Sequence, residues 1–150
     1  MDLQYSGQES IPASKDKVWA FINDPAKVST CLPDVIDTKI NDARNFDATV
    51  KVAVGPVSGK FTFKIALIPA ASGDHMDLKI NGGGFGSVVD LMAGADIKGD
   101  GDTATLDWSA KASMRGPVAT VGGRVLDAQA KRIISMTFAN VKAKLTEAAA

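Results

Sequence analysis

The sequence predicts an α+β fold in which a curved, seven-stranded antiparallel sheet is combined with two short helices and a long C-terminal helix. Three observations predict it: apolar and polar side chains alternate repeatedly between residues 45 and 115, short turns separate the alternating runs, and helical spacing begins after residue 122. The alternation is cleanest at residues 103–115. Because alternation of this kind is typical of strands with one buried face, we expect a one-sided antiparallel sheet.

The N-terminal segment predicts one strand and two short helices. Residues 3–11 form the strand. Ser14 and Asp24 are suited to begin the helices, because their side-chain oxygens can accept hydrogen bonds from free amides of the first turn. Pro25 favours the first helical position, and the second helix should end before Pro33.

Six further strands are predicted from apolar runs bounded by turn residues. They are residues 35–40, 46–54, 60–68, 76–80, 87–98 and 103–115. The short connections, including Gly55-Pro56, favour a meander of hairpins. The glycine-rich segment 82–86 is not followed by Lys-Ser/Thr, so it predicts a hairpin or bulge instead of a nucleotide-binding loop.

The C-terminal segment has its apolar residues at helical spacing. They are Leu126, Ala130, Ile134, Phe138, Val141 and Leu145. A helix over residues 122–147 would be about 39 Å long, and a strand over residues 103–115 about 43 Å. One helix can therefore lie along the concave face of the sheet. No linker or repeat divides the chain, so we expect a single domain over residues 1–150.

Charge and composition exclude several classes of partner and site. The chain has 17 Lys and Arg and 17 Asp and Glu residues, so no basic field attracts nucleic acid, and we expect no nucleic-acid partner. The single cysteine, Cys31, cannot form an internal disulfide. The single histidine, His75, which we place in a turn, cannot build a multi-histidine metal site.

The acidic residues fall mostly in turns or at outward strand positions, and no inward acid, base and nucleophile stand together. We therefore expect no catalytic residues, no metal and no resident cofactor. The N-terminus lacks a signal sequence, and no apolar run reaches eighteen residues, which predicts a soluble, cytoplasmic protein.

The inward residues either interlock as a core or leave an apolar pocket, and the residues alone leave both open. Three of the six inward residues in the last strand are alanine, so open volume is expected at Ala93, Ala95, Ala104, Ala110 and Ala112. The candidate cavity-lining residues are Phe63, Ile65, Leu78, Leu91, Ala93, Ala95, Trp108, Ala110, Ala112, Met114, Leu126, Ala130 and Ile134. Arg124 and Gln129 are the nearest candidates for a polar contact to a ligand.

The order of elements matches the helix-grip (Bet v 1/START-like) arrangement, and several segments resemble one family. They are Val18-Trp19, Asp24-Pro25, Cys31-Leu32-Pro33, residues 55–61, the glycine cluster 82–86, residues 103–108 and residues 116–124. Through them nearly the whole chain resembles the CoxG family of carbon monoxide dehydrogenase, within the SRPBCC group of START and Bet v 1-like domains. The resemblance implies a cavity between the sheet and the C-terminal helix.

The resemblance also implies a function. It suggests a non-catalytic accessory protein that binds a quinone or lipid and serves a molybdenum-containing carbon monoxide dehydrogenase or related hydroxylase, by membrane recruitment or by quinone delivery. Some relatives continue into an apolar tail, whereas this sequence stops at Ala150, so we expect transient contact with the inner face of the membrane instead of permanent anchoring.

Two alternatives remain open. The first is a ligand-free protein-interaction or chaperone-like module, which a filled core beside an exposed apolar patch would favour. The second is a cyclase or hydrolase of the same superfamily, which would need polar residues inside the cavity.

Overall fold

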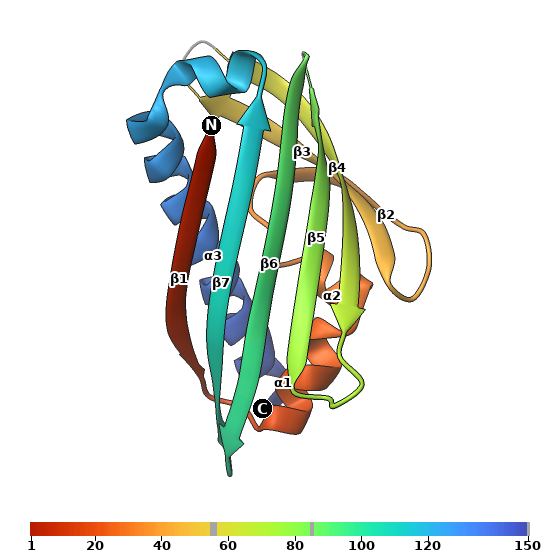
Figure 1. The fold of residues 1–150 in the computed structure, drawn as a ribbon. Helices are drawn as coiled ribbons and strands as arrows, with labels where there is room; N and C mark the ends of the chain where they lie inside the picture. Colours follow the sequence, from red (N-terminus) through yellow and green to blue (C-terminus); the bar gives the residue numbers. More distant parts are fainter. Residues whose placement is uncertain (55–56, 85, 150) are drawn as a thin grey trace.

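The alternating segments pair into one antiparallel sheet, and the helical segments gather on one of its faces (Figure 1). The computed structural model describes residues 1–54, 57–84 and 86–149. Their elements follow one another as β1 (Asp2–Ile11), α1 (Lys15–Ile22), α2 (Pro25–Ser29), β2 (Val35–Ile40), β3 (Asn45–Val54), β4 (Val57–Pro69), β5 (His75–Gly84), β6 (Ser87–Asp100), β7 (Thr103–Arg115), the 3₁₀ helix η1 (Pro117–Val121) and α3 (Gly123–Ala149).

The seven strands lie in the order β1-β7-β6-β5-β4-β3-β2, and all neighbouring strands are antiparallel. The first and last strands of the sequence therefore lie side by side, while α1 and α2 connect the two edges of the sheet. Figure 1 shows α3 running along one face. We call this the inner face and the opposite one the outer face. The predicted fold class is confirmed.

Both predicted helix caps are present. The Ser14 Oγ accepts a hydrogen bond from the Lys17 amide at 3.3 Å. The Asp24 Oδ1 accepts one from the Ala26 amide at 3.0 Å, and α2 begins at the proline that follows. Each cap satisfies a backbone donor that has no partner within its helix.

Three details differ from the predictions. The strand predicted at residues 76–80 extends over 75–84, so His75 is its first residue and not part of a turn. The 3₁₀ helix η1 was not predicted. The predicted turn at Gly55-Pro56 lies outside the described residues, as does Phe85 within the glycine-rich segment.

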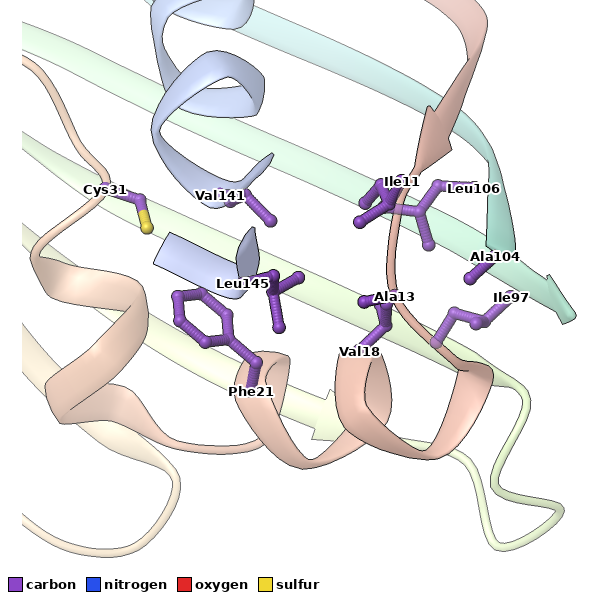
Figure 2. Packing of buried hydrophobic residues seen from close by; sticks show 10 residues of the cluster. All are labelled: Ile11, Ala13, Val18, Phe21, Cys31, Ile97, Ala104, Leu106, Val141 and Leu145. Atoms are coloured by element: carbon purple, nitrogen blue, oxygen red, sulfur yellow. The ribbon is translucent and has the colours of Figure 1, made fainter. Parts of the chain in front are cut away.

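Three separate clusters of apolar side chains form the core. The first, shown in Figure 2, joins α1, the strand ends and the C-terminal part of α3: Ile11, Ala13, Val18, Phe21, Cys31, Ile97, Ala104, Leu106, Val141 and Leu145. The second lies where η1 and the beginning of α3 meet the opposite end of the sheet: Val57, Phe61, Met114, Val118 and Leu126. The third consists of Phe46, Ala48 and Ile65 on β3 and β4, with Val28 and Leu32 packed against it.

The glycine-rich end of β5 allows a close approach between strands. A Cβ atom on Gly82 would overlap the carbonyl oxygen of Thr62 and lie 2.8 Å from the Cα of Phe63, both on β4. A side chain at this position would therefore force two paired backbones apart.

We predict that Gly82→Ala lowers the free energy of unfolding by about 2 kcal/mol, because the added methyl group overpacks the β4–β5 pair. Urea denaturation measures this change. Gly123→Ala is the control: it lies at the start of α3, where the nearest atom to a Cβ is the Met1 Cε at 3.9 Å, and its effect should stay within about 0.5 kcal/mol. Equal stabilities for the two variants would contradict the close approach.

Candidate ligand-binding groove

The middle of the inner face is incompletely filled. Leu126 fixes the beginning of α3 in the second cluster, and Val141 fixes its C-terminal part in the first. Between these residues the helix rises about 22 Å, and there Ala130 and Ile134 are only partly buried. A filled core would bury such side chains completely.

The strands opposite this part of α3 show the same partial burial. On β6 and β7 the inward residues Ala93, Ala95, Ala110 and Ala112 remain partly accessible to solvent. Their methyl groups are too short to span the distance that larger side chains span at the two ends. The small residues therefore leave space between sheet and helix.

A groove of about 450 Å³ opens between β1 and α3. It is lined by Tyr5, Ser6, Glu9, Trp108, Lys131, Ile134, Ser135, Phe138, Ala139 and Lys142. The rings of Trp108 and Phe138 lie with their centroids 5.5 Å apart and their planes tilted by 41°. With Ile134 they give the groove an apolar floor, and its volume lies within the range of small-molecule sites.

Gly7 determines how Trp108 lies in the groove. The two residues face each other in the β1–β7 pair. A Cβ atom on Gly7 would lie 3.0 Å from the Cζ2 and 3.2 Å from the Nε1 of the indole. The missing side chain therefore lets the indole extend over β1.

Polar contacts between β1 and α3 border the groove. The Tyr5 hydroxyl donates a hydrogen bond to the Asp127 Oδ1 at 2.7 Å, and the Lys142 ammonium donates to the Glu9 Oε2 at 2.7 Å. The Lys131 Nζ lies 3.1 Å from the Asp127 Oδ2. Each acidic side chain at the rim thus has a basic partner.

These contacts change the acidity of the Tyr5–Asp127 pair. Burial, with the hydrogen bond to Asp127 and the negative charge of that residue, raises the pKa of Tyr5 to about 12. The hydrogen bonds from Tyr5 and Lys131 lower the pKa of Asp127. The pair therefore consists of a neutral phenol and a carboxylate near neutral pH.

The opposite side of α3 is tied to the segment after α2. The Arg132 guanidinium donates two hydrogen bonds to the Asp34 carboxylate, at 2.8 and 3.2 Å, and lowers its pKa. The Asn140 side chain donates to the Cys31 carbonyl oxygen at 2.9 Å. The Cys31 thiol is buried, which raises its pKa. Polar contacts thus hold α3 on both sides.

The predicted lining residues fall into three groups. Trp108 and Ile134 line the groove. Ile65, Met114 and Leu126 are buried in the clusters at the margins of the inner face. The remaining predicted residues are partly buried on the inner face: Phe63, Leu78, Leu91, Ala93, Ala95, Ala110, Ala112 and Ala130.

Two other expectations about the cavity find no counterpart in the groove. Ala104 was expected beside open volume, but it is completely buried in the first cluster, where larger neighbours fill the space. Arg124 and Gln129 do not line the groove, and Arg124 is exposed. Its polar residues come instead from β1 and from later turns of α3.

The outer face carries a second polar group of side chains. The His75 Nδ1 lies 2.7 Å from the Asp96 Oδ1, and its Nε2 lies 2.8 Å from the Asp77 Oδ1. Asp96, and after it Asp77, raise the pKa of His75. Within the described part of the chain, no three His, Cys, Asp or Glu side chains are placed to hold a metal ion.

The architecture defines a helix-grip domain of the START and Bet v 1-like class. A conserved protein from Geobacillus kaustophilus is similar with a TM-score of 0.86 and 23% identity, over 97% of this chain and 96% of that chain. A START superfamily protein from Mycobacterium smegmatis gives 0.71 and 14%, over 96% and 97%. The ZhuI aromatase/cyclase from a Streptomyces species gives 0.70 and 13%, over 100% and 97%. At these identities the likeness shows the fold alone.

The family model of CoxG, a subunit of carbon monoxide dehydrogenase, matches residues 7–146, and the chain belongs to this family. The predicted family is thereby confirmed. A comparison with curated proteins finds no significant match. Among the helices of the described residues, none has the length and apolar character needed to cross a membrane.

The chain's single tyrosine gives a direct test of the groove's rim. Because Tyr5 has a pKa of about 12 and the ordinary value is 10.0, we predict that only roughly a tenth of the phenol is ionised at pH 11, against roughly nine-tenths for an unperturbed tyrosine. The stabilisation tied to the neutral phenol is complete below pH 10 and is lost as the pH rises toward 12.

Absorbance at 295 nm follows this ionisation. Asp127→Asn should lower the pKa of Tyr5 without restoring the ordinary value, because burial is the largest cause of the shift. Asp107→Asn, which removes a carboxylate of the outer face, should leave the titration unchanged. A wild-type transition near pH 10 would show that the Tyr5–Asp127 contact does not form in solution.

Proposed function

We propose that the protein is a non-catalytic accessory protein that binds an apolar small molecule between the sheet and α3. The observation that carries this proposal is the groove of about 450 Å³ with its floor of Trp108, Ile134 and Phe138. A concave, mainly apolar site with few polar groups suits a hydrophobic ligand. The partly buried alanines of the inner face favour open space over the filled core of a ligand-free interaction module.

The polar side chains of the groove support binding over catalysis. Glu9 is paired with Lys142, and Asp127 with both Tyr5 and Lys131. Groups held in such pairs are poorly suited to exchange protons with a substrate, because transfer would break an existing contact. The fold itself does not make this distinction, since it also occurs in an aromatase/cyclase.

Membership of the family supports a more specific role. The family's name connects it with carbon monoxide dehydrogenase, so the proposed partner is a molybdenum-containing enzyme of that type, and the proposed ligand is a quinone or a lipid. In this role the protein would act in the cytoplasm, where it delivers a quinone or brings the enzyme to the inner face of the membrane through transient contact.

Binding of 2-methyl-1,4-naphthoquinone, measured by isothermal titration calorimetry, tests the carrier function. Ala139→Trp places a large side chain at the groove lining and should weaken binding at least about tenfold by occupying the site. Ala143→Trp is the matched control, because Ala143 is also an exposed alanine of α3 but does not line the groove. Equal affinities in both variants, or no binding to the wild type, would contradict the proposal.

A further inference from the structure

The indole N–H of Trp108 lacks a partner. Its Nε1 atom is buried, and it has no hydrogen-bond partner among the described residues. A buried donor that has lost water without gaining an acceptor is unfavourable, and an indole N–H can only donate. The group would be satisfied by an acceptor atom brought in from outside the chain.

The N–H lies beside the groove. The indole lines the groove and contacts the Phe138 ring on α3. Its Nε1 edge lies over Gly7, 3.2 Å from the position that a Cβ atom of this residue would take. Ser6, the neighbour of Gly7, lines the same groove. A molecule that enters between β1 and α3 therefore meets the donor edge of the indole.

The charges at the groove restrict the acceptor. Glu9 and Asp127 carry two negative charges, and Lys142 and Lys131 carry two positive charges, each within 3.1 Å of its partner. Because these charges neutralise one another, the rim has no free cation to balance an ionised carboxylate or phosphate. An uncharged oxygen such as a carbonyl loses much less hydration than an anion on entering the groove.

We infer that Trp108 determines the specificity of the groove by donating its Nε1–H to an uncharged carbonyl oxygen on an otherwise apolar ligand. This inference rests on the proposed function and adds the polar feature that the ligand must carry. Since Nε1 is buried in the ligand-free protein, the contact between Trp108 and Phe138 must open as the carbonyl enters. Trp108 is thus both a wall of the groove and its hydrogen-bond donor.

The test compares 1-tetralone with tetralin, which have the same two-ring skeleton and differ by one carbonyl group. Calorimetry gives the ratio of their affinities for the wild type and for Trp108→Phe, and the ratio cancels the different hydration of the two ligands. Loss of the donor should reduce the relative preference for the ketone about three- to tenfold. Phe138→Leu, which alters the other ring of the groove but leaves the donor in place, should preserve the ratio.

A second measurement uses the wild type alone. On addition of 1-tetralone the Trp108 indole N–H proton resonance should move downfield, while that of Trp19, the only other tryptophan, stays in place. Tetralin should not produce the downfield shift. This readout applies even if Trp108→Phe does not fold.

The outcomes separate the inference from the proposed function. An unchanged ratio in Trp108→Phe, or no downfield shift with the ketone, would overturn the donor role while apolar binding stands. Tighter binding of 1,2,3,4-tetrahydro-1-naphthoate than of 1-tetralone would overturn the requirement for an uncharged acceptor. If the wild type binds neither tetralin nor 1-tetralone, the proposed function fails together with the inference.

Discussion

The packing of α3 against the two ends of the sheet is the constraint on which the groove depends. Leu126 anchors one end of the helix, and Val141 and Leu145 anchor the other in clusters that exclude solvent. A helix is stiff over the distance between these anchors, so it cannot bend toward the sheet to fill the space between them. Burial at the ends therefore stabilises the fold while leaving the middle of the inner face accessible.

Side-chain size and polar contacts maintain this arrangement. Alanines on β6 and β7 supply little volume in the middle of the sheet, and Gly7 leaves room for Trp108. Hydrogen bonds hold α3 to β1 on one side and to the segment after α2 on the other. Because these contacts are peripheral, they fix the position of the helix without filling the groove. The same features that limit core packing thus provide a binding site.

The sequence predicted the fold well because its signals are local. Alternation placed the strands, and Ser14 and Asp24 marked the helices by caps that act within three residues. Contacts between distant residues were missed: the Tyr5–Asp127 hydrogen bond joins positions 122 residues apart. The role of Gly7 depends on the β1–β7 register, which alternation alone does not fix. The extent of β5 was underestimated because Gly82 to Gly84, residues typical of turns, remain paired in the sheet.

Native mass spectrometry of the protein purified from its own host tests the central claim most directly, that the space between sheet and α3 is a binding site. The account predicts one apolar molecule bound per chain, which solvent extraction releases and which rebinds to the emptied protein. An empty protein that also shows no saturable binding of quinones or lipids would contradict it, and would mean that the open inner face serves a purpose other than carrying a ligand.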